Sequence, residues 1–338
     1  MTESILFILS VFFIFIFTKV CEKNKFFVDF KKEKHKRFVS KTNNYSIGGI
    51  IFFLFCLFIF FTDNYFNPLF WVFFSLIFFL GLFSDLKIFK SPKLRFLLQL
   101  TILIFFVLVV DFKIPLSNIE FIDFFLSNLY FNKLFTIFCL MILLNGNNFV
   151  DGINTLLIGY NIILTAFLLI TFSELLPKKD ILVDYLIILF ALLIFNLNGK
   201  IILGDAGAYA LAFFLGVFLI EFASFNPYLS PFFVISIIWY PCFELLFSII
   251  RRLNYLKKTY EPDTIHLHQL LYKYYSKKIK NNYLTHLTVS SIINGFFIIS
   301  LIINKAYGYK SSVIVIFLII NITSYLILYN FLKKKIKD

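Results

Sequence analysis

The sequence predicts an all-α integral membrane protein. Of its 338 residues, 60% are hydrophobic and only 15% are charged, whereas about 25% are charged in a typical soluble domain. The mean hydropathy is +0.88. Apolar stretches of about 20 residues, the length that crosses a bilayer as a helix, recur along the whole chain. A soluble enzyme is excluded, because a soluble fold of this length could not hide so much apolar surface.

Eleven segments are apolar enough, and near enough to the required length, to be predicted as membrane-spanning helices. They lie at residues 4–20, 47–62, 68–84, 94–112, 131–145, 153–173, 181–196, 206–223, 231–250, 288–304 and 311–332. We expect the first to be retained rather than cleaved as a signal peptide, because it lacks a basic start and no small-residue cleavage site follows it. Residues 1–338 are expected to form a single polytopic membrane domain.

The distribution of Lys and Arg predicts the orientation. With the N-terminus outside, 26 of the 32 Lys and Arg residues fall on the cytoplasmic side, where cationic loops are retained. The C-terminus is then cytoplasmic. The predicted cytoplasmic loops lie at about 21–46, 85–93, 145–152, 197–205 and 251–287.

Charge and cysteine content narrow the choice of partners. The net charge of +13 indicates contact with anionic membrane lipid and phosphorylated substrates, and no nucleic acid partner is expected in this membrane setting. The four cysteines show no CxxC spacing, so neither a disulfide framework nor a zinc site is indicated.

Five compact polar clusters lie at the cytoplasmic ends of predicted helices. They are 46–49, 81–85, 145–154, 203–207 and 262–269. The outward loops contain no comparable Asp-Gly or Asn-Asp combinations. We therefore expect tertiary packing to bring the five clusters into one cytosol-facing site.

Three carboxylates and two histidines in these clusters point to phosphate chemistry. Mg²⁺ is usually bound by one or two carboxylates together with water and substrate phosphates, and Asp85, Asp151 and Asp205 supply such groups. His266 and His268 suit the binding or protonation of a phosphate better than zinc binding, because no third soft ligand is near them in the sequence.

The same residues also have structural interpretations. Asp85 or Asp205, taken singly, could be a helix cap. Gly48 and Gly49 are more often helix-packing or turn residues than ligand contacts.

Glu244 lies inside the ninth predicted span. A carboxylate in a membrane is costly, and it is more often functional or paired than incidental. Pairing with Arg251 or Arg252, about two turns along the helix, would make it structural.

In these motifs the chain resembles the polyprenyl-phosphate N-acetylhexosamine-1-phosphate transferases of glycosyltransferase family 4. The resemblance covers nearly the whole chain. The family's Asn-rich loop ending in Asp-Gly is similar to 145–154, its Gly-Asp-x-Gly motif to 204–207, and its histidine motif to Pro262-Asp263 followed by 266–268. The segment 240–252 is similar to the branch that initiates O-antigen and other surface polysaccharides.

Four positions depart from the family pattern. Ser84 precedes Asp85 where an Asp-Asp pair is usual. Thr155 stands where the Asn-rich motif normally ends in glycine. Gln269 follows His268 where another histidine is common, and the proline before the Gly-Gly pair is missing. We interpret these as subfamily variation, because the other carboxylates and both histidines remain.

The resemblance implies that a (N-acetyl)hexosamine 1-phosphate is transferred from a UDP-N-acetylhexosamine to undecaprenyl phosphate, with release of UMP. This would be the first membrane step of surface polysaccharide or cell-wall polymer synthesis, in the bacterial inner membrane. Mg²⁺, or alternatively Mn²⁺, is the implied cofactor, and a homodimer is one option for the assembly.

Implied roles for individual residues fall into three groups. They are metal binding by Asp205 and Asp151, catalysis by Asp85, Asp151, His266 and His268, and substrate binding by Lys41, Gly48, Gly49, Asn145, Asn148, Asn154 and Arg252. The alternative is a transporter or channel without transferase activity. A transporter or channel would be expected to have ionisable residues near the membrane midplane, broken helices and internal repeats. In the sequence, only Glu244 meets any of these expectations, as an ionisable residue inside a predicted span.

Overall fold

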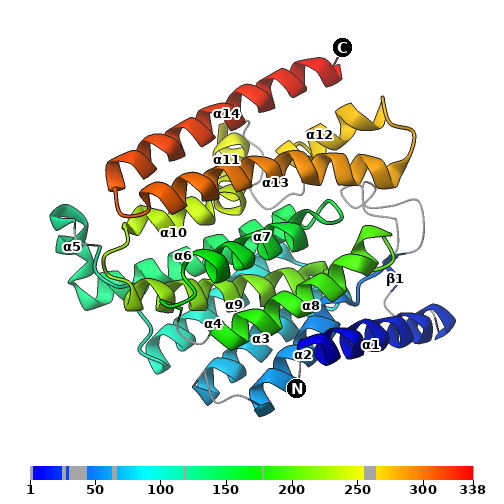
Figure 1. Cartoon of the computed structure of the whole chain (residues 1–338), viewed down its shortest axis with the longest axis horizontal. Helices are drawn as coiled ribbons and strands as arrows, with labels where there is room; N and C mark the ends of the chain where they lie inside the picture. Colours follow the sequence, from blue (N-terminus) through cyan, green and yellow to red (C-terminus); the bar gives the residue numbers. More distant parts are fainter. Residues whose placement is uncertain are drawn as a thin grey trace.

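The structure is a computed structural model that describes residues 3–24, 28–29, 44–62, 67–117, 119–176, 179–254 and 264–337. The described chain forms a bundle of helices, with one antiparallel strand pair between β1 (Val28–Asp29) and β2 (Asn44–Tyr45). Figure 1 shows α5 at one end of the bundle and β1 and α12 toward the other. The helices are α1 (Glu3–Asn24), α2 (Gly48–Thr62), α3 (Pro68–Asp85), α4 (Pro92–Val109), α5 (Glu120–Leu126), α6 (Leu129–Val150), α7 (Leu156–Thr171), α8 (Lys179–Leu197), α9 (Gly204–Phe225), α10 (Pro231–Ile237), α11 (Trp239–Asn254), α12 (Leu267–Ser276), α13 (Asn282–Tyr307) and α14 (Ser311–Lys337).

The all-α membrane class is confirmed. Within the described ranges, 8 helices are long and apolar enough to span a membrane, or up to 9 if the bent pair α10 and α11 is one span. Helices α2 and α7 are apolar but shorter. Each of the eleven predicted segments therefore contains a helix or a helix pair, while the count of eleven spans and the orientation stay predictions.

The ninth predicted span is not one continuous helix. Helices α10 and α11 are bent by 78° relative to each other. The break places Pro241 in the first turn of α11, where its missing N–H removes no intrahelical hydrogen bond. In a continuous helix, Pro241 would leave the carbonyl four residues earlier without its donor and would clash with it.

The Asn-rich segment is not a loop over most of its length. Helix α6 continues to Val150, so that Asn145, Asn147 and Asn148 lie in its last two turns. Asn145 Nδ2 donates to Met141 O at 2.9 Å and to a side chain of α4. Such tertiary contacts offset the low helix propensity of asparagine, which local sequence reasoning does not anticipate. The predicted loop 251–287 likewise contains α12.

Helix α9 is at the centre of the bundle. It has the highest buried fraction among the candidate spans, and it packs against α2, α3 and α6. A Cβ atom on Gly49 would lie 2.3 Å from Gly207 N, and one on Gly81 would lie 2.5 Å from Ala206 Cα. The backbones of α2 and α3 therefore touch the first turn of α9, as small residues permit in membrane bundles.

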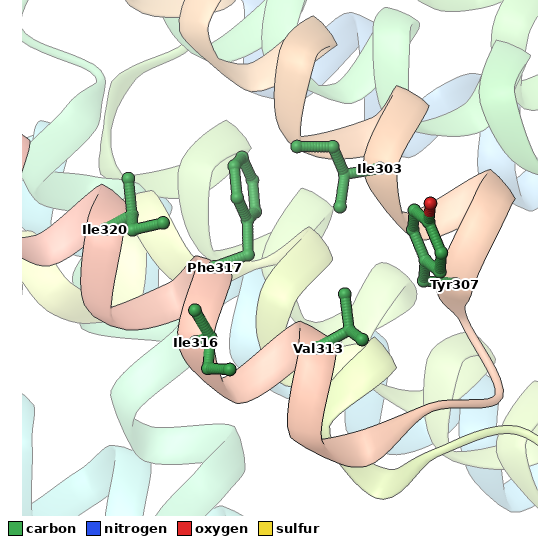
Figure 2. A pocket seen from close by; sticks show the side chains of 6 residues that line it. All are labelled: Ile303, Tyr307, Val313, Ile316, Phe317 and Ile320. Carbon is green, nitrogen blue, oxygen red and sulfur yellow. The ribbon is translucent and has the colours of Figure 1, made fainter.

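An apolar cavity of about 400 Å³ lies between α13 and α14 (Figure 2). It is lined by Ile303, Tyr307, Val313, Ile316, Phe317 and Ile320. None of the predicted site residues is in this lining.

Candidate functional site

Two predicted catalytic carboxylates meet at the N-terminus of α9. Asp85, the last residue of α3, accepts hydrogen bonds from Asp205 N to Oδ1 at 3.0 Å and from Ala206 N to Oδ2 at 3.1 Å. Asp151, which follows α6, accepts from Gly204 N at 3.1 Å. The first N–H groups of a helix lack intrahelical partners and carry partial positive charge. The two carboxylates therefore cap α9 and tie three helix ends together.

Gly204 allows this close approach. Its φ is +71°, and a Cβ atom there would lie 2.3 Å from Ser46 Oγ and 2.5 Å from Asp85 Oδ2. Only glycine adopts this backbone conformation without penalty and also leaves room for both groups. The residues just before α2 thereby join the carboxylate cluster.

Gly48 and Gly49 occupy packing positions. Both are buried, and their N–H groups donate to Ile202 O at 3.0 Å and Leu203 O at 3.1 Å. These contacts match the structural interpretation of the glycine pair. A substrate-binding role for them stays a prediction.

Asp205 forms an ion pair that sequence reasoning missed. Its Oδ2 accepts from Arg95 Nη1 and from Ser84 Oγ, each at 2.5 Å. In the sequence, Arg95 stands out only as one of the cationic residues on the predicted cytoplasmic side. A usable signal was present, because Arg95 and Gln99 are spaced i, i+4 and so lie on one face of a helix that is otherwise mostly apolar.

The predicted asparagines are held by neighbouring helices. Asn145 donates to Gln99 Oε1 of α4 at 3.0 Å, and Asn148 donates to Tyr209 Oη of α9 at 3.2 Å. Asn154, between α6 and α7, contacts α13 through its backbone N–H, which donates to His286 Nδ1 at 3.3 Å. Tyr209 and His286 were not predicted.

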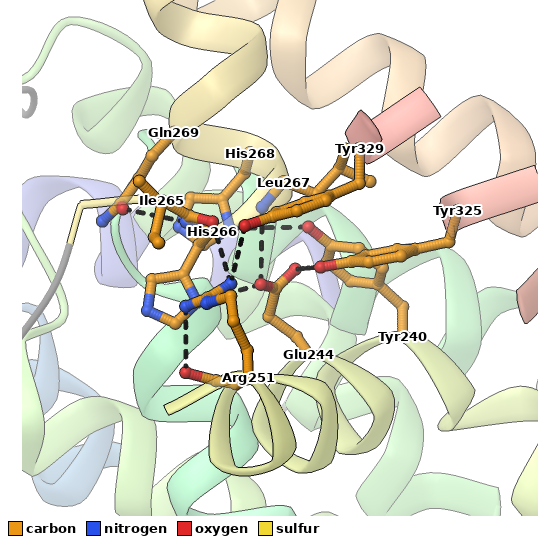
Figure 3. Close-up of polar contacts among 11 residues, drawn as sticks. Tyr240, Glu244, Arg251, Ile265, His266, Leu267, His268, Gln269, Tyr325 and Tyr329 are labelled. Atoms are coloured by element: carbon orange, nitrogen blue, oxygen red, sulfur yellow. Dashed lines mark hydrogen bonds and ion pairs between the residues drawn. The ribbon is translucent and has the colours of Figure 1, made fainter. Parts of the chain in front are cut away.

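Around the histidine motif, α11, α12 and α14 form a buried polar cluster (Figure 3). His266 Nδ1 lies 2.9 Å from Glu244 Oε1, and Tyr325 Oη donates to Glu244 Oε2 at 2.9 Å. The rings of His266 and His268 stack with their centroids 5.6 Å apart. His266 has extended backbone geometry just before α12, and this lets the two rings share one side.

The sequence leaves open whether Glu244 pairs with an arginine. In the structure its carboxylate pairs with His266, just before α12. Arg251 Nη1 donates to Ile265 O at 3.0 Å and to Tyr329 Oη at 3.3 Å.

His268 is neutral at ordinary pH. Burial, helped by the neighbouring His266 and opposed by Glu244, lowers its pKa to about 3. Its Nε2 is buried and has no hydrogen-bond partner among the described residues. Nε2 lies beside Gly152, where an added Cβ atom would be 3.0 Å from it. A neutral His268 therefore offers hydrogen bonding rather than a positive charge.

The end of α6 joins the carboxylate and histidine clusters. The ring of Phe149 lies 4.9 Å from the ring of His266, and the guanidinium of Arg252 lies 5.5 Å from the Phe149 centroid. Asp151 and Gly152 follow directly. The expected convergence of the five motifs is confirmed for their described residues, while the side of the membrane that they face stays a prediction. Lys41 and Pro262-Asp263 lie outside the described residues.

The described carboxylates do not by themselves form an enclosed metal site. In the described part of the chain, no group of three or more His, Cys, Asp or Glu side chains could hold a metal ion. Both oxygens of Asp85 accept helix N–H groups, and one oxygen of Asp205 faces Arg95. Asp205 and Asp151 are each partly exposed, so any Mg²⁺ held there would need substrate phosphates and water to complete its coordination.

Comparison with known families identifies one match. Residues 67–223 match the family model described as glycosyl transferase family 4. The matched segment contains Asp85, Asp151 and Asp205 but not the histidine cluster. Over this segment, which is less than half of the 338 residues, the chain is similar to glycosyl transferase family 4, and this similarity supports a transferase. Comparison with curated proteins finds no match.

Proposed function

We propose that the protein transfers a (N-acetyl)hexosamine 1-phosphate from a UDP-sugar to undecaprenyl phosphate and releases UMP. The proposal places this reaction at the first membrane step of surface polysaccharide or cell-wall polymer synthesis, in the bacterial inner membrane. One observation carries it. Asp85, Asp151 and Asp205 come from three separate chain segments and meet at the first turn of α9, inside the matched segment and beside Arg95.

In the proposed reaction, an oxygen of the lipid phosphate attacks the β-phosphorus of the UDP-sugar. A new P–O bond forms, and the bond from the β-phosphorus to the oxygen bridging to the UMP phosphate breaks. The lipid phosphate is largely ionised at neutral pH, so a strong base is not required. Catalysis then depends on positioning and on the neutralisation of phosphate charge.

The residues of the carboxylate cluster divide these tasks. Mg²⁺, held by Asp205 and Asp151 together with the substrate, would neutralise charge on the diphosphate. Arg95 carries a fixed positive charge beside that position. Because both oxygens of Asp85 are bonded to α9, we assign Asp85 to orientation of the site rather than to proton abstraction.

Arg252 and His266 contact the ring of Phe149 near the end of α6, and we assign both to the binding of phosphate or nucleotide. Asn148 is held by its hydrogen bond to Tyr209, so its carbonyl remains available to hydrogen-bond a substrate group.

The test is an assay with purified protein, undecaprenyl phosphate, Mg²⁺ and a panel of UDP-N-acetylsugars. We expect UMP release with at least one donor. Release with no donor, by protein shown to be folded, would contradict the transferase and favour the transporter or channel alternative.

A pair of matched variants then tests the site. Asp205→Asn is expected to abolish turnover and to leave membrane insertion intact. The control is Asp180→Asn, the same change at an exposed position in the first turn of α8, which is expected to keep wild-type activity. Wild-type turnover by the Asp205 variant would refute the role of that carboxylate.

A further inference from the structure

Glu244 and Tyr325 form a buried pair that the mechanism above does not use. Glu244 is fully buried, and an unpaired carboxylate there would be strongly unfavourable. Both of its oxygens are engaged. Oε1 lies 2.9 Å from His266 Nδ1 and 3.4 Å from Leu267 N, and Oε2 accepts from Tyr325 Oη at 2.9 Å (Figure 3).

These contacts determine which nitrogen of His266 carries the proton that faces Glu244. An ionised carboxylate only accepts hydrogen bonds, so the Nδ1 atom beside it carries a proton. In a neutral imidazole the other nitrogen, Nε2, is then the acceptor, since the hydrogen bond of one ring nitrogen sets the state of the other.

The backbone around His266 is held as firmly as its ring. Arg251 donates to Ile265 O at 3.0 Å, and His266 N donates to Gln269 Oε1 at 3.3 Å. The edge of the ring packs against Phe149 at the end of α6. The ring is therefore locked between the buried carboxylate and the element that carries Asp151.

We propose that Glu244 and Tyr325 are positioning residues for His266. They fix its ring orientation and keep a proton on Nδ1, so that His266 is held in one orientation for the proposed transfer reaction, on which this inference rests. Tyr325 lies on α14, outside the matched segment 67–223. The C-terminal helix is thereby part of the site.

The sharpest test removes one hydroxyl group at a time. Tyr325 and Tyr329 lie one turn apart on α14, and both are buried with their rings stacked. Only Tyr325 is bonded to Glu244, whereas the hydroxyl of Tyr329 accepts from Arg251. We expect Tyr325→Phe to lower kcat by roughly 10- to 100-fold, as is usual when the partner that orients a functional histidine is lost. KM for the UDP-sugar should change little, and the control Tyr329→Phe should stay near wild type.

Glu244→Gln extends the test. It keeps the shape of the side chain but allows the amide to donate to Nδ1, and we expect a loss of kcat at least as large as that of Tyr325→Phe. Equal losses in Tyr325→Phe and Tyr329→Phe, or wild-type kcat in folded Glu244→Gln, would overturn the proposal. If Glu244→Gln does not fold, the two tyrosine variants decide.

A second readout does not depend on activity. In ¹⁵N-histidine NMR of the full-length protein in detergent, with His266→Gln used for assignment, His266 should be protonated at Nδ1 in the wild type. This state should change in Glu244→Gln. A wild-type His266 protonated only at Nε2 overturns the positioning role. Absence of UMP release by the wild type would instead refute the proposed function, while the NMR spectra still decide whether Glu244 holds the Nδ1 proton.

Discussion

Thr155 adopts a backbone conformation that disfavours its own side chain. It precedes α7 with a φ of +68°, although it is β-branched, and such residues are genuine outliers in the left-handed region. Its N–H donates to Asn196 Oδ1 at 2.5 Å, which holds the turn in place. The family that the chain resembles has glycine at this position. The positive φ explains that preference and implies that Thr155 adopts a strained backbone conformation.

Replacing Thr155 by glycine should therefore stabilise the turn relative to any other small residue. The left-handed conformation costs an L-residue roughly 1–2 kcal/mol, and glycine avoids this cost. Glycine also makes the unfolded chain more flexible, which lowers the free energy of unfolding by roughly 0.5–1 kcal/mol. The matched control is Thr155→Ala, which loses the same methyl and hydroxyl groups but retains Cβ. We expect the glycine variant to exceed the alanine variant by about 1 kcal/mol in free energy of unfolding.

The comparison is made by denaturant titration of both variants in the same detergent, followed by circular dichroism. The buried Thr155 hydroxyl has no partner among the described residues, and both variants lack it. Its effect on the free energy of unfolding therefore cancels, and the two variants differ only in Cβ. An alanine variant as stable as the glycine variant would show that the turn is unstrained, and the reasoning from φ would fail.

Three further predictions concern packing, charge and pH. Gly49→Ala should lower the yield of folded protein in fluorescence-detected size exclusion, because the new Cβ atom would lie 2.3 Å from the backbone of α9. Gly295→Ala is the control, since its Cβ atom would meet nothing within 4 Å, and the higher helix propensity of alanine should raise the melting temperature. Arg95→Ala should reduce kcat far more than Arg95→Lys in the UMP-release assay, since lysine retains a cation for Asp205. Burial lowers the pKa of His268 from 6.5 to about 3. Between these two pH values the unfolded chain binds a proton at His268 and the folded chain does not, so the free energy of unfolding falls as the pH falls from 6.5 toward 3. Above pH 6.5 this contribution to stability is complete. His268→Gln should show a shallower loss of melting temperature with acidification, and an unchanged slope would contradict the assignment.

Sequence patterns were sufficient where the determinant is local. Long apolar runs located the helices, because burial in a bilayer requires about the same length of apolar chain wherever it occurs. They did not locate the break at Pro241, since proline near the middle of an apolar run is also tolerated in a kinked continuous span. Nor did they show that α6 reaches Val150, because the asparagines there are stabilised by partners on other helices.

The same distinction explains the site. The polar motifs could be expected to converge, since each lies near a helix end on one predicted side. Their contacts could not be predicted, because Asp85 caps a helix that begins about 120 residues later in the chain, whereas a cap is recognised in sequence by residues next to the helix. Glu244 was a recognisable anomaly, but its partner depended on where α12 packs.

The capping of α9 also constrains how the site can hold phosphate. The N-terminus of a helix attracts anions through its free N–H groups, yet the first three N–H groups of α9 already donate to Asp151 and Asp85. In the proposed reaction, the substrate phosphates therefore need positive charge from elsewhere, and Arg95 lies beside this turn through its bond to Asp205. Ser84 becomes intelligible in this setting. Its hydroxyl donates to the Asp205 carboxylate at 2.5 Å, whereas an aspartate at that position would add a like charge beside it and compete for the same guanidinium. The serine thus keeps the hydrogen bond to Asp205 without adding a negative charge, and in the proposed reaction this leaves more of the positive potential of Arg95 for the substrate phosphates.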